Sequence, residues 1–258
     1  MKTWLKLTCI PSCAAAVYAL GVRPRLLRWG ATDAEIAEPY PGAELIPEGE
    51  RSATMAVTID APPARVWPWL AQMGYGRAGW YSWDHLDNLG RPSAAELHPE
   101  WQDIQVGDFL GPQEGVTSRA WEVAALEPER FLGLRASFDL RKGAWYDPAG
   151  PRPPFSTDSL WGFQLKPLPD DRTRLIVSGY WAFQPRWLQP LMRVLFLDLE
   201  HWIMQTRQFT NLKRLAETDA ATATEEVTVA QPAAAGTVEP GLTTAPLQAH
   251  VGEAGVDR

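Results

Sequence analysis

Large apolar side chains occupy every second position in several short stretches of this chain. The clearest stretch is Trp161-Gly162-Phe163-Gln164-Leu165-Lys166, in which apolar residues alternate with small or polar ones. A period of two places alternate side chains on one face of a β-strand. The same pattern, bounded by turn residues, predicts strands over 54–59, 106–110, 119–127, 131–139, 159–167 and 173–183. Pro169-Asp170-Asp171 predicts a tight turn, so the last two strands should form an antiparallel hairpin.

Apolar residues recur at a helical spacing after the first predicted strand. Asp60-Ala61-Pro62-Pro63 predicts a helix start there, because a proline in the first turn lacks only an N–H group that has no helical partner at that position. This helix should end at Gly74, and a second short helix is expected over 83–89. The apolar positions of the first helix are Val66, Trp67, Trp69, Leu70 and Met73.

A long helix is predicted over 187–215. One apolar stripe along it consists of Leu188, Met192, Leu195, Leu199, Trp202 and Ile203, joined by Thr206. Val194, Leu197 and Met204 lie on the opposite side, beside His201. A helix that is apolar on two sides must bury both. One side is expected to cover the sheet, and the other to meet the N-terminal helix, a partner or a membrane.

These elements divide the chain into four parts. Residues 1–24 predict an apolar N-terminal helix, residues 25–50 an extended linker rich in Pro, Gly and acids, and residues 51–215 one folded domain. Residues 216–258 hold no aromatic residue and are rich in Ala, Thr, Glu, Pro and Gly, which predicts a disordered tail.

The N-terminal segment admits three interpretations. Leu7 to Val22 carries no charge and is interrupted by Pro11, and this run is shorter than the roughly 20 residues that a membrane span needs. The alternatives are a membrane-associated anchoring helix, a soluble helix that packs on the domain, and a cleaved signal peptide processed at Ala14-Ala15-Ala16. A cytoplasmic location is expected, with membrane association through residues 1–24 as the variant.

Composition narrows the classes of function. The 13 tryptophans outnumber the 8 phenylalanines and the 6 tyrosines, and a buried indole N–H needs a partner, so a wide apolar interior with polar points is expected. The net charge of −7 argues against nucleic acid as a partner, since that requires a basic face. Cys9 and Cys13 both precede the folded domain, so neither a disulfide framework nor a cysteine metal site is expected in it.

Familiar catalytic and cofactor motifs do not explain the chain. Gly74-Tyr75-Gly76-Arg77-Ala78-Gly79 matches G-x-G-x-x-G, but it follows a helix without a parallel βαβ unit, so a flexible connection or a gate at a pocket mouth is expected there. The histidines, His85, His98, His201 and His250, lack a metal-binding spacing. Neither a nucleophile elbow nor a P-loop occurs. No metal and no cofactor is therefore expected.

The order of predicted elements resembles the helix-grip fold of the START/Bet v 1-like (SRPBCC, polyketide cyclase-like) superfamily. The stretch from Asp60 to Leu70 is similar to its first strand and first helix, and Trp161 to Pro167 followed by Thr173 to Val177 is similar to its late hairpin. Residues 27–32 and 79–84 resemble an uncharacterised bacterial branch. The resemblance implies an α+β fold in which a curved antiparallel sheet wraps around the long C-terminal helix, with two short helices after the first strand and a cavity between sheet and helix.

The expected function is binding or carriage of a small hydrophobic molecule, such as a lipid, an isoprenoid or a polyketide-like compound, in that cavity. The alternatives are a polyketide cyclase/aromatase-like enzyme and a membrane-tethered interaction domain without a ligand. Asp84, His201 and Tyr81 are the catalytic candidates, although a helix cap for Asp84 and a satisfied structural role for His201 are simpler interpretations. The candidate ligand-binding residues are Trp67, Trp80, Tyr81, Trp83, Trp121, Phe138, Trp161, Phe163, Trp181 and His201.

Overall fold

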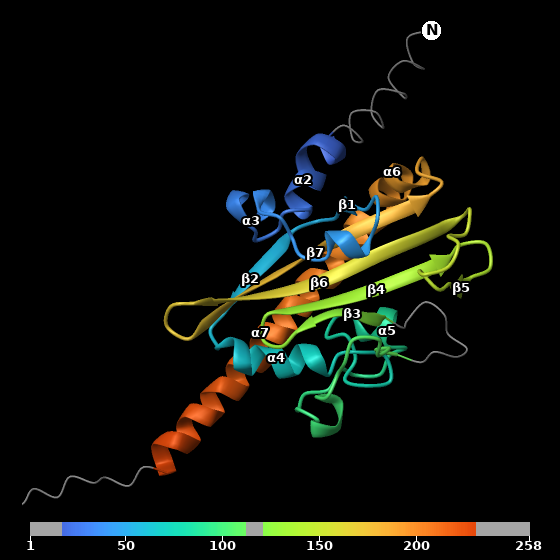
Figure 1. The fold of residues 1–258 in the computed structure, drawn as a ribbon. Coiled ribbons are helices and arrows are strands. Elements are labelled where there is room, and N and C mark those ends of the chain that lie inside the picture. Colours follow the sequence, from blue (N-terminus) through green and yellow to red (C-terminus); the bar gives the residue numbers. More distant parts are fainter. Residues whose placement is uncertain (1–16, 112–120, 231–258) are drawn as a thin grey trace, which may run out of the picture.

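The computed structural model describes residues 17–111 and 121–230 and has the predicted α+β class (Figure 1). A curved antiparallel sheet of seven strands lies against one long helix, α7 (Asp198–Ala230), an arrangement compatible with a helix-grip fold. The order in the sheet is β1 (Glu50–Arg51), β7 (Arg172–Gln184), β6 (Ser156–Leu168), β4 (Phe131–Asp139) and β3 (Glu122–Glu127), with β2 (Met55–Ile59) also paired to β7 and β5 (Ala144–Trp145) paired to β4.

The predicted hairpin is formed by β6 and β7 at the centre of the sheet. Its register starts at Leu168 opposite Arg172. Asp170 and Asp171 turn the chain with φ angles of 62° and 52°, a left-handed backbone that aspartate tolerates better than most residues. β4 has the predicted bounds, whereas β6 and β7 both extend beyond the predicted strands.

The predicted strand over 106–110 is wrong. Within the described residues this stretch contributes one isolated bridge, Phe109 opposite Glu122. Gly107 has a φ angle of 97°, which interrupts extended backbone. The stretch stays attached to the sheet because the Leu110 amide donates to the Trp121 carbonyl over 2.8 Å. β3 begins at Glu122, and residues 119 and 120 of its predicted range lie outside the described residues.

Two short helices follow β2, as predicted. The first, α4 (Pro63–Ala71), buries Val66, Trp69 and Leu70 toward the sheet and α7. The second, α5 (Asp84–Asp87), is a single turn that lies close to α7. A 3-10 turn, η3 (Pro99–Trp101), lies in the connection between α5 and β3.

Residues 25–50 do not form an extended linker, so that prediction is wrong. The segment carries α2 (Arg23–Leu26), α3 (Asp33–Ala37) and the 3-10 turn η2 (Ala43–Leu45), and it covers the face of the sheet opposite α7 (Figure 1). Tyr40 and Ile46 are buried in a second core on that face. Apolar burial of this kind stabilises a segment that composition alone assigns to the surface.

A capping box begins α3. The Thr32 hydroxyl accepts from the Glu35 amide, and the Glu35 carboxylate accepts from the Thr32 amide over 2.7 Å. The same carboxylate pairs with the Arg174 guanidinium of β7 at 2.7 Å. Glu35 therefore fixes the start of α3 and links residues 25–50 to the sheet.

Stability should fall at low pH through Glu35. The hydrogen bonds from Arg174 lower the pKa of this carboxyl from 4.5 to about 2. A carboxyl whose pKa is lower in the folded than in the unfolded chain stabilises the fold above the unfolded pKa and loses that contribution as the pH falls toward the folded one. Urea unfolding at pH 7, 4 and 3 should therefore show a smaller acid-induced loss for Glu35→Gln than for the natural chain. Glu44→Gln, an exposed carboxyl of the same segment, is the control, and equal losses in all three proteins would contradict the role of Glu35.

The long helix has bounds that differ from the predicted 187–215. It starts as α6 (Leu188–Met192), widens into a π-helical turn, η4 (Arg193–Leu197), and continues as α7 to Ala230. The predicted disorder from residue 216 is thus wrong for 216–230, which contain good helix formers and neither Pro nor Gly. Glu217 in this stretch accepts from the Asp60 amide over 2.8 Å. Residues 231–258 of the predicted tail lie outside the described residues.

Of the two predicted apolar sides of the long helix, the stripe that contains Leu199 and Ile203 is only partly buried. Leu199 and Ile203 of that stripe are 42% and 37% exposed, whereas Gln205 and Gln208 are each 1% exposed. The side that holds His201 faces the sheet instead. The reason is that the two glutamines satisfy each other by hydrogen bonding, which an apolar pattern does not register.

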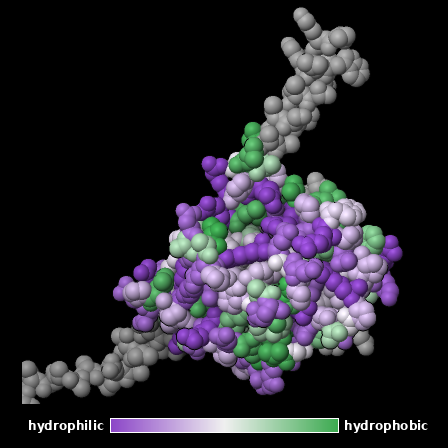
Figure 2. Space-filling model, turned by 45° about the horizontal axis from the view of Figure 1, so that its top comes forward, coloured by the Kyte–Doolittle hydropathy of each residue, from purple (hydrophilic) through white to green (hydrophobic). Residues whose placement is uncertain are grey.

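The N-terminal segment meets α7 through a charge pair and a ring stack. Arg23 pairs with Asp198 at 2.6 Å, and the Trp29 and Phe209 rings stack with centroids 5.9 Å apart. Before α2, the π-helical turn η1 (Tyr18–Val22) exposes apolar side chains where the described chain begins (Figure 2). Residues 1–16, with most of the predicted apolar helix, lie outside the described residues. Across 17–111 and 121–230, no helix combines the length and apolar character that crossing a membrane requires.

Candidate functional site

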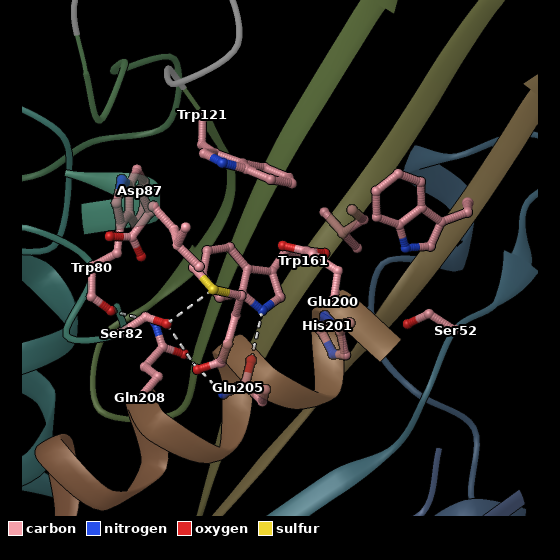
Figure 3. Close-up of a pocket in the computed structure, with 14 residues that line it drawn as sticks. Ser52, Trp80, Ser82, Asp87, Trp121, Trp161, Glu200, His201, Gln205 and Gln208 are labelled. Carbon is pink, nitrogen blue, oxygen red and sulfur yellow. Dashed lines mark hydrogen bonds between the residues drawn. The ribbon is translucent and has the colours of Figure 1, made fainter. Parts of the chain in front are cut away.

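A cavity of about 550 Å³ lies between the first turns of α7 and the sheet (Figure 3). Strands β6 and β7 form one wall, and the segment that contains α5 closes one side. The lining residues are Ser52, Trp80, Ser82, Leu86, Asp87, Trp121, Leu160, Trp161, Trp181, Glu200, His201, Met204, Gln205 and Gln208.

Three tryptophans form a continuous aromatic wall around Trp161. The Trp161 ring centroid lies 5.8 Å from that of Trp80 and 5.4 Å from that of Trp121. Behind it, Phe163 packs on Trp161 at 4.7 Å. Trp161 and Phe163 are two residues apart on β6, so the strand pleat directs both toward α7. The wall therefore follows from the alternation of β6.

A row of side-chain amides on α7 holds this wall in place. The Trp161 indole donates to Gln205 Oε1 over 3.2 Å, and Gln205 Nε2 donates to Gln208 Oε1 over 2.8 Å. Gln208 Nε2 then donates to the Trp80 carbonyl over 2.8 Å. Each buried polar group in this row has a partner, so the row fixes two tryptophans relative to one helix face.

Glu200 and His201 border the same cavity at the start of α7 (Figure 3). Burial lowers the pKa of His201 to about 4, against an opposing effect of Asp198, so the ring is neutral at pH 7. Partial removal from water raises the pKa of Glu200, whose side chain keeps some exposed surface. The His201 Nε2 atom is buried without a hydrogen-bond partner among the described residues. A satisfied structural histidine, the simpler interpretation, leaves this nitrogen unaccounted for among the described residues.

Five of the predicted ligand-binding residues line the cavity. They are Trp80, Trp121, Trp161, Trp181 and His201. Three of the five precede or belong to strands of the sheet, and His201 faces them from α7. The structure thus brings these residues together around one space.

The remaining candidates lie elsewhere. Phe163 is fully buried behind Trp161, and Trp67 packs at the edge of the main core. Phe138 pairs with a neighbouring tryptophan near the end of β4. Trp83 is 46% exposed on the outer surface. Size and aromatic character predicted these four residues, but none of them is among the residues that line the cavity.

Tyr81 and Asp84 are not among the residues that line the cavity, and their catalytic roles stay predictions. Tyr81 is 1% exposed and accepts a hydrogen bond from the Gln72 amide, and burial raises its pKa to about 12. Asp84 accepts from the Ser93 amide over 3.1 Å and from the Ser93 hydroxyl over 2.6 Å. Asp84 is also not the cap of α5, because Trp83 occupies that position without a side-chain cap. His201 is the one catalytic candidate that borders the cavity.

The G-x-G-x-x-G stretch is a closed turn. The Gly74 and Gly79 amides donate to each other's carbonyls, both over 3.0 Å. Arg77 inside the turn donates to the Ala71 carbonyl over 3.0 Å and to the Trp101 carbonyl over 2.6 Å. A turn held in this way positions Trp80, which follows it.

Sequence reasoning missed the polar half of the lining. Gln205, Gln208 and Met204 share a helix face with His201, since residues three and four apart on a helix are neighbours. That spacing is the signal that could have found them. The other residues missed are Ser52, Ser82, Leu86, Asp87, Leu160 and Glu200.

Comparisons with known proteins concern the fold. No family model and no curated protein matches the chain. Similar solved structures include a protein from Arthrobacter aurescens (16% identity over 66% of this chain and 88% of that one, TM-score 0.37) and MLL2253 from Mesorhizobium loti (20% identity, 64% and 97%, TM-score 0.33). Another is CalU16 from Micromonospora echinospora (14% identity, 69% and 89%, TM-score 0.28). At these identities and TM-scores the similarities carry no statement about function. Within the described residues, no three metal-ligating side chains cluster.

Proposed function

We propose that this protein binds and carries a small hydrophobic molecule, of the lipid, isoprenoid or polyketide-like kind, between α7 and the sheet. The observation that carries the proposal is the wall of Trp80, Trp121 and Trp161 around a space of about 550 Å³. Ligand pockets are typically of this order of size and mostly apolar, with a few polar groups that fix orientation. The resemblance to the START/Bet v 1-like superfamily supports the same proposal, as does an arrangement compatible with a helix-grip fold.

The polar side of the cavity suits an oriented ligand. Burial of apolar ligand surface against the indole rings contributes roughly 25 cal/mol of binding free energy for each Å² removed from water. Gln205 and Gln208 already satisfy each other and Trp161, so the amide row stiffens the wall and leaves few groups for a ligand. A membrane-tethered domain with a collapsed cavity, the third alternative, is disfavoured by the volume between α7 and the sheet.

A second candidate function is a polyketide cyclase/aromatase-like enzyme. Glu200 and His201 favour it, because both border the cavity and their pKa values are shifted toward the neutral forms of both groups. Perturbed titratable groups in a cleft are common in catalytic sites. One of them could donate and the other accept a proton during ring closure of a positioned chain. A carrier releases its ligand chemically unchanged, whereas a cyclase releases a different compound, which is an isomer of the substrate after ring closure alone or has lost water after dehydration.

Native mass spectrometry of the purified full chain tests the proposal. We expect an adduct of a few hundred daltons that survives gentle ionisation and separates from the chain on denaturation. After the chain is stripped and incubated with a hydrophobic extract of the expression host, the same mass should return. A chain that carries no adduct, and that accepts neither this extract nor the neutral fluorophore N-phenyl-1-naphthylamine, would contradict the proposed function.

A further inference from the structure

The polar groups that border the cavity fall into two kinds. Ser82, Gln205 and Gln208 are bonded to the chain, since the Ser82 hydroxyl donates to the Met204 carbonyl over 2.9 Å and the two amides belong to the row that ends at Trp80. Glu200 and His201 are different. The buried His201 Nε2 has no hydrogen-bond partner among the described residues, and Glu200 beside it is an exposed carboxyl at the cavity. Buried polar atoms are nearly always bonded, so His201 Nε2 is the atom at which the cavity offers a ligand a hydrogen bond.

The charge of the lining sets the kind of ligand. Neither lysine nor arginine is among the residues that line the cavity, while Asp87 and Glu200 both are. Arg193, which lines an adjacent pocket together with Glu200 and His201, is engaged by Glu50 at 3.5 Å and by Asp198 at 3.6 Å. An anionic ligand would lose its hydration there and meet no lysine or arginine among the lining residues, which is unfavourable.

The chemistry of the free pair narrows the ligand further. A carboxylate only accepts hydrogen bonds, whereas a neutral imidazole has one donor and one acceptor nitrogen. A hydroxyl group donates and accepts, so it can satisfy Glu200 and His201 together, whichever ring nitrogen carries the proton. A carbonyl or ether oxygen only accepts, so it could bond His201 Nε2 in one tautomer alone and could not donate to Glu200. Beside the pair stands the indole wall, which suits a flat ring.

We propose, given the binding function proposed above, that the ligand is an uncharged ring-bearing alcohol or phenol whose hydroxyl group lies between Glu200 and His201, and that carboxylates are excluded. The ring packs on the wall of Trp161, Trp80 and Trp121. The hydroxyl donates to the Glu200 carboxyl and completes the hydrogen bonding of the His201 ring. The pair therefore acts as the specificity-determining part of the cavity.

Three fluorescent probes with one ring system test this inference. Pyrene carries no polar group, 1-pyrenemethanol carries a hydroxyl group, and 1-pyrenecarboxylate carries a negative charge. At pH 7, the dissociation constant of 1-pyrenemethanol, measured by quenching of tryptophan fluorescence, should be at least tenfold lower than those of the other two. This comparison uses the natural chain and needs no variant to fold.

A double variant tests whether Glu200 and His201 cause the preference for 1-pyrenemethanol. Glu200→Met/His201→Phe keeps the approximate shapes and removes the polar atoms, so it should bind pyrene and 1-pyrenemethanol within about twofold of each other. The chain offers a matched control in Glu100 and His98, a surface pair outside the cavity at 3.3 Å. Glu100→Met/His98→Phe should keep the preference of the natural chain.

The outcomes separate this inference from the function on which it rests. Tight binding of pyrene without a preference for the alcohol, or tighter binding of the carboxylate, would overturn the inference and leave the hydrophobic carrier standing. Loss of the preference in the control variant would also overturn it. Failure of all three probes, together with an empty chain in native mass spectrometry, would remove both.

Discussion

Met204→Trp is expected to raise the dissociation constant of a neutral hydrophobic probe by at least tenfold while the protein stays folded. Met204 lines the cavity beside Ser82, with its carbonyl already bonded to the Ser82 hydroxyl. A tryptophan at this position fills space that the ligand would occupy, and a tenfold change corresponds to about 1.4 kcal/mol of binding free energy. Titration with N-phenyl-1-naphthylamine, followed by its own fluorescence, measures the effect.

Leu199→Trp is the matched control for the filled cavity. It adds an indole to the same helix, but at a residue that is 42% exposed. This variant should bind the probe as the natural chain does, and thermal unfolding should report whether each variant is folded. Unchanged affinity in a folded Met204→Trp protein would place the probe, and with it the proposed ligand, outside this cavity.

Gly179→Ala is expected to destabilise the fold by about 3 kcal/mol, at the upper end of what overpacking costs. Gly179 lies on β7 opposite Trp161 of β6. A Cβ atom there would lie 1.8 Å from the Leu160 carbonyl oxygen, which is backbone and cannot rotate away. The central hairpin must therefore separate, and the Trp161 wall must move with it.

Urea unfolding at pH 7 measures this loss. Gly21→Ala is the control, because its added Cβ would approach nothing closer than a mobile arginine side chain at 4.0 Å. The control should unfold at the urea concentration of the natural chain or above it. A loss below about 1 kcal/mol for Gly179→Ala would show that the β6–β7 pair adapts without strain.

The sheet was predictable because its pattern and its energetics agree. In β6 the apolar positions Trp161, Phe163 and Leu165 all face one way, and an Asp-Asp turn suits the chain reversal that follows. The same reasoning failed for residues 25–50. Their burial depends on Tyr40 and Ile46 meeting a distant face of the sheet, which no local pattern reveals. The Thr32–Glu35 capping box was a local signal of structure that composition obscured.

The tryptophans and His201 of the candidate site were predictable, whereas the glutamines were not. Trp161 stood out because a large side chain on an alternating strand must face a core or a cavity. Gln205 and Gln208 did not stand out, because a polar residue on a helix is normally exposed and only their mutual hydrogen bond makes burial favourable. Tyr81 and Asp84 do not line the cavity, because polar and aromatic residues that are neighbours along the chain need not face the same cavity.

The π-helical turn η4 has a consequence for the number of residues this helix can contain. A π turn holds more residues than an α turn, and one residue corresponds to about 100° of rotation in an α-helix. If Arg193–Leu197 formed α turns with no residue removed, α6 would rotate by about 100° relative to α7. Gln189, which now accepts from the Phe183 amide of β7 over 3.2 Å, would then turn away from the sheet. The π turn therefore allows both the docking of α6 and the inward direction of His201, and deletion of one residue within Arg193–Leu197 should leave both in place in an unbroken α-helix.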